Sequence, residues 1–216
     1  MSAWLRVLTR DSLRHGVQEL AARDADLAAL HVRLGAPPLW GRRPGFATLV
    51  HIILEQQVSL VAARTLYRRL RAHLGSIDPE GIVAMRESGL RRFGLTRQKS
   101  RYCHGLALRV LDGRLDLGAT ARGPDEEGRR ALLAVPGLGP WSVDISYLMA
   151  LRRPDVWPTG DLALAVALRE VKHLPRLPSR DEQQVFTAAW APWRAVAARM
   201  LWAHYLEARG QYSPAT

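Results

Sequence analysis

The sequence contains a single cysteine, Cys103, and this scarcity excludes several kinds of site. One cysteine cannot form an intrachain disulfide, and it cannot supply a cysteine-rich zinc site or an iron–sulfur cluster. We interpret Cys103 as a half-buried thiol within a helix, not as a catalytic one. The protein is therefore expected to carry no iron–sulfur cluster.

Long hydrophobic runs are also lacking. No apolar stretch is long enough to span a bilayer, and the N-terminus has no charged segment that leads into an apolar run. We expect a soluble protein of the cytoplasm, associated with the nucleoid if its host is bacterial, with no membrane partner.

Acidic residues are few relative to basic ones, with 20 Asp and Glu against 31 Lys and Arg, which gives a net charge of +11. Such an excess favours a polyanionic partner, and nucleic acid is the commonest one. Lysine is itself scarce, because only Lys99 and Lys172 occur, so an arginine-rich genome is an alternative source of the charge. Since 48% of the residues are hydrophobic, the 216-residue chain is globular and long enough for one large or two small domains.

No segment alternates apolar and polar residues as a convincing β-strand does. Helical spacing, capping residues and Gly or Pro stops predict an all-α fold instead. Helices are predicted at residues 10–22, 24–34, 44–74 with a break at Gln56-Gln57, 78–93, 97–113, 125–134, 141–151, 161–172 and 181–208. Residues 114–126 and 174–179 read as loops.

A glycine hairpin separates two of these helices, where residues 133–142 read Leu-Ala-Val-Pro-Gly-Leu-Gly-Pro-Trp-Ser. Glycine permits a positive φ and has no Cβ that would keep a phosphate away. A helix that begins near Pro140 offers free N–H groups to an anion. An ordinary corner between two helices has the same composition, so the motif alone leaves both interpretations open. The basic charge of the chain favours phosphate binding.

A carboxylate, Asp161, follows the hairpin by about twenty residues and begins another predicted helix. The residues alone favour an N-cap for this side chain. Asp144 and Asp155 are the other acids in this part of the chain. Asp144 lies inside the helix that follows the hairpin, and we interpret it as structural.

The hairpin segment resembles the helix–hairpin–helix of base-excision DNA glycosylases, most nearly that of the 3-methyladenine DNA glycosylase II branch. Three further segments agree in order, and the resemblance covers about residues 20–208. These segments are Phe46 to Ser59, Gly94 to Lys99 and Trp190 to Arg194. The resemblance implies a helix–hairpin–helix glycosylase fold with two helical subdomains that flank a DNA-binding cleft. The expected subdomains are residues 40–125 and residues 1–39 plus 126–216.

The resemblance also implies an activity, the hydrolytic release of alkylated bases such as 3-methyladenine after they are flipped from double-stranded DNA. The essential aspartate of the family falls on Asp161, where a carboxylate stabilises positive charge at the sugar C1′ and orients water. Bifunctional members carry a lysine two residues after the second hairpin glycine. Trp141 occupies that position here, so a monofunctional enzyme that uses water is implied. We also expect the protein to be a monomer.

Two alternatives stay open at this point. The chain is a helix–hairpin–helix module that binds DNA without chemistry, or it is a glycosylase for another damaged base such as hypoxanthine, an etheno adduct or uracil. Neutral bases need more activation of the leaving group, and the sequence shows no obvious second acid for this purpose.

The resemblance assigns further residues to the site. Trp141 and Trp202 fall in the base pocket, Ile145 stands where a close relative has a tyrosine, and Trp40 and Phe46 complete the pocket. Trp190 and Trp193 are interpreted as core residues. Gln57 takes the position of the DNA wedge, and Gln56 is expected to contact neighbouring bases or the opposite strand.

The remaining assignments concern the DNA backbone and an ion. Backbone contacts are implied for Gly137, Gly139, Ser142, Arg97 and Lys99. No organic cofactor is implied. A structural monovalent cation, Na⁺ or K⁺, is implied at the hairpin, held by the main-chain carbonyls of Leu133, Val135 and Leu138.

Overall fold

The structure, a computed structural model, describes residues 7–212 and contains no β-strand in that range. The all-α prediction is confirmed for this part of the chain. The residues divide into two compact units. Unit 1 consists of the chain up to Gly41 and from Tyr147 onward, and unit 2 consists of Arg42–Ser146.

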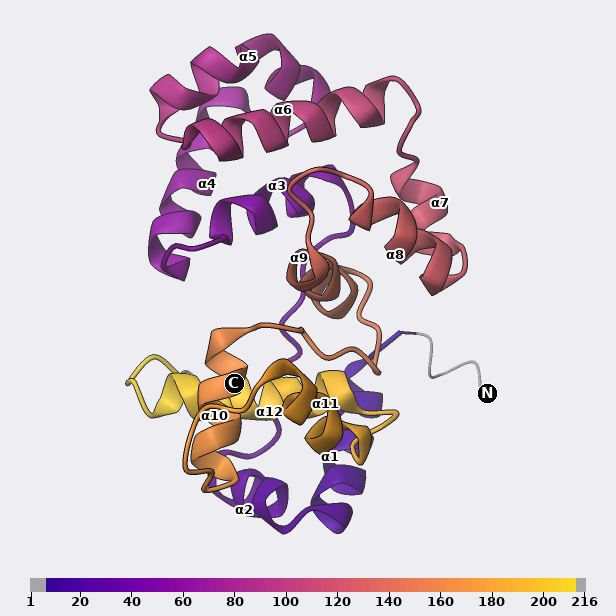
Figure 1. Cartoon of the computed structure of the whole chain (residues 1–216), viewed down its shortest axis with the longest axis vertical. Helices are drawn as coiled ribbons and strands as arrows, with labels where there is room; N and C mark the ends of the chain where they lie inside the picture. Colours follow the sequence, from indigo (N-terminus) through magenta and orange to yellow (C-terminus); the bar gives the residue numbers. More distant parts are fainter. Residues whose placement is uncertain (1–6, 213–216) are drawn as a thin grey trace. The chain divides into compact units, whose positions relative to one another are not determined.

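Unit 1 is built around α12, which packs against α1, α2 and α10 (Figure 1). The helices of this unit are α1 (Arg10–Arg23), α2 (Ala25–Leu34), α10 (Leu162–Val171), α11 (Arg180–Ala188) and α12 (Arg194–Glu207). Four alanines and a valine of α12 are buried, and their small volume allows neighbouring helices to approach closely. Trp190 and Trp193 are buried just before α12, which confirms their interpretation as core residues.

Unit 2 has α3 at its centre, packed against α4, α6 and α9, while α5 lies along α6 (Figure 1). Its helices are α3 (Phe46–Glu55), α4 (Leu60–Leu74), α5 (Pro79–Phe93), α6 (Arg97–Leu111), α7 (Leu117–Arg122), α8 (Asp125–Leu133) and α9 (Pro140–Ile145). Eight of the ten residues of α3 are buried, as expected of a mainly apolar helix that has neighbours on several sides. A π-helical turn, η2 (Ser146–Ala150), follows α9.

The structure corrects two of the predicted elements. The expected loop at 114–126 contains α7, which Asp116 caps by accepting the Ala119 N–H at 2.9 Å. The expected single helix at 181–208 is interrupted between α11 and α12, because Pro192 has no N–H to continue the hydrogen-bond ladder. The predicted break at Gln56-Gln57 is confirmed, since α3 ends at Glu55 and α4 begins at Leu60.

The second boundary between the units lies at Ser146, whereas the sequence placed it near residue 125. The reason is the packing of the segment that follows. Helix α8 lies against α7, and α9 lies against both α8 and α3. The hairpin between α8 and α9 therefore belongs to the same unit as the expected wedge helix.

A buried guanidinium, that of Arg199 on α12, holds the main chain of unit 1 together. Its Nη2 donates to the carbonyl oxygens of Trp40 at 3.1 Å and Leu148 at 3.0 Å, and its Nη1 donates to Ala195. The side chain is fully buried, and this desolvation lowers the pKa of Arg199 to about 10. The guanidinium stays charged at neutral pH, and its hydrogen bonds to carbonyl oxygens stabilise the charge.

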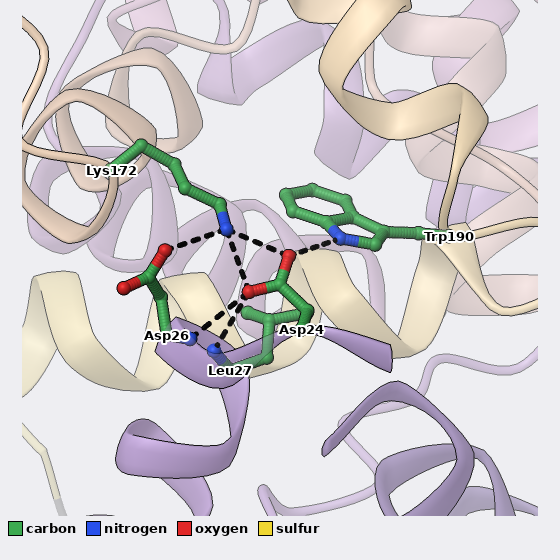
Figure 2. A network of polar contacts seen from close by, with 5 residues as sticks. All are labelled: Asp24, Asp26, Leu27, Lys172 and Trp190. Carbon is green, nitrogen blue, oxygen red and sulfur yellow. Dashed lines mark hydrogen bonds and ion pairs between the residues drawn. The ribbon is translucent and has the colours of Figure 1, made fainter. Parts of the chain in front are cut away.

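A polar network around Asp24 joins three distant segments of unit 1 (Figure 2). The Lys172 ammonium donates to both Asp24 oxygens at 2.6 and 2.7 Å and to Asp26 at 2.7 Å. The Trp190 indole donates to Asp24 Oδ2 at 2.8 Å, while Oδ1 caps α2 by accepting the N–H groups of Asp26 and Leu27. One carboxylate thereby links α2 to Lys172, which follows α10, and to Trp190, which precedes α12.

The network shifts the pKa values of Asp24 and Lys172. Burial alone would raise the pKa of Asp24, but the hydrogen bonds from Lys172, Trp190 and the Leu27 N–H outweigh burial and lower it. Burial would lower the pKa of Lys172, but its bonds to the two aspartates outweigh burial and raise it. The stabilisation from Asp24 is therefore lost as pH falls through its lowered pKa, and that from Lys172 is lost as pH rises through its raised pKa.

Replacing Lys172 with methionine is expected to lower the free energy of unfolding by about 1–3 kcal/mol, because Asp24 then loses its charged partner. The deficit is greatest between about pH 5 and pH 9. It shrinks below about pH 4, because there the Asp24 carboxyl is protonated in the unfolded chain while its lowered pKa keeps it ionised in the folded wild-type protein. Urea denaturation followed by circular dichroism measures both effects. The control is Arg14→Met, which removes an exposed ion pair with Asp11 and changes stability by less than about 1 kcal/mol. A deficit that is constant down to pH 3 contradicts the assignment.

Candidate functional site

The hairpin joins α8 to α9 and is closed by its own main chain. The Val135 N–H donates to Leu132, and the Leu138 N–H donates to Val135, each at 3.0 Å. Gly137 has a φ of +96°, in the region that favours glycine, and a Cβ there would lie 2.4 Å from Tyr102 Cγ. The fold itself therefore requires glycine at position 137.

Gly139 differs from Gly137 in both respects. Its φ is −80°, which any residue adopts, and a Cβ built there meets no atom of the described residues within 4 Å. The residue is exposed. Nothing within the described chain requires glycine here, so a bulkier residue at this position would change only what approaches the hairpin from outside.

The C-terminal end of α3 lies against the hairpin. The Gln56 side-chain nitrogen donates to the Gly137 carbonyl at 2.8 Å and to the Ser142 hydroxyl at 3.0 Å. Ser142 is only 2% exposed, so its hydroxyl is engaged inside unit 2. Gln57 is exposed and has a φ of +56°, which is uncommon for a residue with a side chain.

Arg97 and Lys99 are the two basic residues assigned to the DNA backbone, and Lys99 already makes a hydrogen bond within the protein. Its ammonium donates to the Leu54 carbonyl at 2.8 Å, near the end of α3. Burial lowers the pKa of Lys99. Arg97 is exposed in the first turn of α6. Two of the three ammonium hydrogens of Lys99 remain for other acceptors, since that group has three donors.

A buried carboxylate that the sequence analysis overlooked adjoins Gln56. Glu55 receives two hydrogen bonds from Arg42, at 2.9 and 2.6 Å, and His51 lies 3.6 Å from the same carboxylate. His51 stacks on Tyr67, and its burial lowers the pKa of His51. The Arg42–Glu55 pair anchors the last turn of α3. The i,i+4 spacing of His51 and Glu55 is a sequence signal for this contact.

In unit 1, Asp161 immediately precedes α10 and lies beside Trp202. Its Oδ1 accepts the Leu164 N–H at 3.0 Å, as an N-cap does, and the Trp202 indole N–H at 3.4 Å. Both side chains are partly exposed. The structure thus brings together two residues that the sequence assigned to the same site.

The two other acids considered in the sequence are held in ion pairs. Asp144 is buried in α9 and pairs with Arg129 of α8. Asp155 receives two hydrogen bonds from Arg194, at 2.6 and 2.8 Å, at the start of α12. Each pair connects neighbouring segments of its own unit, which is a structural role.

The remaining residues of the expected base pocket lie in both units. Trp40 is in unit 1 with Asp161 and Trp202, and its carbonyl is bonded to Arg199. The other three, Phe46, Trp141 and Ile145, are in unit 2. Phe46 and Ile145 are buried, and Trp141 is partly exposed.

Among residues 7–212, no group of three or more His, Cys, Asp or Glu side chains is arranged to hold a metal ion. No helix in this range combines the length and the apolar content needed to cross a membrane. Cys103 is fully buried, whereas the sequence predicted a half-buried thiol, and desolvation raises the pKa of Cys103 to about 12, so its thiol is not a nucleophile at neutral pH.

The fold and the hairpin define a helical protein of the helix–hairpin–helix class. The sequence matches the model of the HhH-GPD superfamily of base excision DNA repair proteins over residues 50–195. This match spans more than half of the chain, and the chain belongs to that superfamily. The resemblance carried by the hairpin and its flanking segments is confirmed.

Solved structures agree with this membership. The 3-methyladenine DNA glycosylase Mag1 of Schizosaccharomyces pombe, in complex with abasic DNA, superposes with a TM-score of 0.80, at 24% identity, over 87% of this chain and 95% of that one. A DNA-3-methyladenine glycosidase of Bacillus halodurans gives a TM-score of 0.75, at 26% identity, over 91% and 92% of the two chains. The helix–hairpin–helix glycosylase fold is therefore confirmed.

A relative in sequence is the probable bifunctional transcriptional activator and DNA repair enzyme AlkA of Mycobacterium tuberculosis. It is 32% identical, and the match covers 88% of this chain and 42% of that protein. The chain spans about half the length of the first curated relatives that it matches.

Proposed function

We propose that this protein is a monofunctional DNA glycosylase of base excision repair, which hydrolyses the N-glycosidic bond of alkylated bases such as 3-methyladenine. The observation that carries the proposal is the Asp161–Trp202 pair in a chain of this superfamily. Relatives that align with this chain are named for 3-methyladenine, which supports the same substrate class.

Asp161 is suited to stabilise a cationic transition state. Breaking the bond to an alkylated base develops positive charge on the sugar, and a nearby carboxylate lowers the energy of that charge and orients water. The Leu164 N–H and the Trp202 indole both donate to Oδ1, which fixes the orientation of the carboxylate. An alkylated base is already positively charged and leaves with little or no acid assistance.

Trp202 supplies an aromatic face beside this carboxylate. An indole attracts a positively charged ring more strongly than a neutral one, because its face carries excess electron density. This preference supports alkylated purines over neutral lesions. Trp141, Trp40, Phe46 and Ile145 are proposed as further pocket residues.

Unit 2 is proposed to hold the DNA backbone. The hairpin at Gly137 and Gly139 offers main-chain N–H groups to a phosphate, and the exposed Arg97 adds positive charge. Gln57, exposed beside the hairpin-bound Gln56, is proposed to fill the gap left by the flipped base. The partner is double-stranded DNA with a damaged base, bound by a monomer.

A structural monovalent cation is proposed at the hairpin. The Val135 carbonyl accepts the Leu138 N–H, which uses one of its two lone pairs and leaves the other for an ion. The carbonyls of Leu133 and Leu138 would complete the set. Such an ion would rigidify the turn and would take no part in bond cleavage.

Duplex DNA that carries N3-methylated adenine is expected to lose free base when it is mixed with the protein. The strand stays intact until the abasic product is treated with alkali, because Trp141 replaces the lysine that bifunctional enzymes use. Chromatography of released bases and gel analysis of the strand measure both steps. A panel of duplexes with hypoxanthine, ethenoadenine and uracil serves for comparison. Binding of these duplexes without release of any base establishes the non-catalytic module instead.

A further inference from the structure

The side chain of Gln56 is directed into the hairpin. Its amide nitrogen carries two hydrogens, and it donates one to the Gly137 carbonyl at 2.8 Å and one to the Ser142 hydroxyl at 3.0 Å. Gly137 belongs to the turn, and Ser142 belongs to the first turn of α9. One side chain from the end of α3 therefore joins the turn to the helix that follows it.

The peptide unit between Gly137 and Leu138 is held from both sides as a result. Its carbonyl accepts from Gln56, and its N–H donates to Val135 at 3.0 Å. Tyr102 of α6 packs directly against Gly137, and the Tyr102 hydroxyl accepts a hydrogen bond from Gln98 at 2.7 Å. The direction of the hairpin main chain is thus set by contacts from α3 and α6.

Gln56 also precedes the exposed Gln57, whose φ of +56° is strained for a residue with a side chain. Such a conformation persists only where its surroundings hold it. Lys99 holds the Leu54 carbonyl on one side, and the amide of Gln56 is held by the hairpin on the other. The turn that presents Gln57 is therefore fastened to the same hairpin.

We infer that Gln56 is a positioning residue, which fixes the hairpin and the Gln57 turn relative to each other and does not itself contact DNA bases. The role differs from the base contact that the place of Gln56 in the sequence predicted. The inference rests on the proposed function for one point, that the hairpin holds the phosphodiester backbone of duplex DNA. In that setting Gln56 acts through the hairpin, and Gln57 is the side chain that enters the duplex.

The test compares Gln56→Met with Gln57→Met. Methionine is close to glutamine in length and flexibility and donates no hydrogen bond. In the DNA-free protein, hydrogen exchange of the Leu138 N–H is expected to accelerate about tenfold in Gln56→Met. Without the bond from Gln56 to the Gly137 carbonyl, the hairpin turn opens more often and exposes this N–H to solvent. The Gln57→Met variant is expected to keep the wild-type exchange rate. Equal exchange rates in all three proteins overturn the inference.

Binding and catalysis separate the two glutamines further. At fixed salt, Gln56→Met is expected to raise the dissociation constant for undamaged duplex about tenfold, an effect larger than its effect on the single-turnover rate at saturating protein. Gln57→Met is expected to act mainly on that rate, because a wedge serves base flipping. A Gln56→Met variant that binds undamaged duplex normally but excises slowly is in direct contact with bases, and the inference is then wrong.

A double-mutant cycle on DNA binding provides a third test. If Gln56 acts through the hairpin, the losses of binding in Gln56→Met and Gly139→Ala are less than additive, whereas those of Gln57→Met and Gly139→Ala are additive. Additive losses in the first pair contradict the inference. The exchange and binding measurements need no excision, so they remain decisive even if the wild-type protein releases no base and the proposed function fails.

Discussion

Excision by the Asp161→Asn variant is expected to be slower than that of the wild-type protein by a factor of about 10² to 10³ or more, with folding stability and DNA binding retained. The size of the loss is that of removing one group that stabilises the charge of a transition state. Single-turnover assays on duplex DNA with an alkylated base measure the rate.

The substitution is informative because it separates the two roles of this residue. Asparagine caps helices about as well as aspartate, so the bond from the Leu164 N–H to the side-chain oxygen is kept. The amide oxygen also accepts the Trp202 indole N–H. What disappears is the negative charge. If Asp161 is only an N-cap, the variant excises at the wild-type rate, and the proposed mechanism is wrong.

Two companion variants calibrate the result. Asp161→Ala removes the cap as well, and is expected to lose about 1 kcal/mol of stability in addition to activity. Asp78→Asn makes the same exchange at the N-cap of α5 in unit 2, and is expected to leave excision unchanged. Thermal unfolding of each variant separates loss of folding from loss of chemistry.

Alanine at either hairpin glycine is expected to weaken DNA binding, but only the Gly137 substitution is expected to reduce folding stability. Gly137→Ala forces a Cβ to 2.4 Å from Tyr102 Cγ at a φ of +96°. The clash and the backbone strain together cost about 2–4 kcal/mol of folding stability. DNA binding then falls because the hairpin is displaced.

Gly139→Ala meets neither obstacle, and is expected to change stability by less than about 1 kcal/mol. Its dissociation constant for duplex DNA is nevertheless expected to rise about tenfold or more, because the new methyl group stands where a phosphate approaches the main chain. Unfolding curves and binding titrations at one salt concentration provide the comparison. Wild-type affinity in a stable Gly139→Ala protein contradicts a DNA backbone contact at this turn.

Most of the helices were predictable because local signals mark their ends. Asp24, Thr96 and Asp161 each precede a helix and cap it, and the glycine after α2 stops that helix. The errors arose where local signals were weak. The six-residue α7 is too short to show a period, and the interruption before α12 was obscured by apolar residues that continue the helical spacing on both sides of Pro192.

The part of the candidate site that the family motifs cover could be predicted from the sequence. The Asp161–Trp202 contact joins residues that the family resemblance placed together, although 41 positions separate them. The bonds of Gln56 were not predictable, because they depend on how α3 packs on α9 across 81 positions. Polar residues beside a hairpin look alike in sequence, whether they face inward or toward a ligand.

The hydrogen bonds of Arg199 show how the two parts of unit 1 are connected. Its Nη2 reaches the carbonyl oxygens of both Trp40 and Leu148, so these two oxygens lie no farther apart than the combined length of those two bonds. Trp40 is the last residue but one of the first part of unit 1, and Leu148 is the second residue of the other part. Unit 2 is therefore an insertion in the sequence of unit 1. The two parts of unit 1 that flank this insertion lie close together at their ends, and the Arg199 guanidinium joins them by hydrogen bonds.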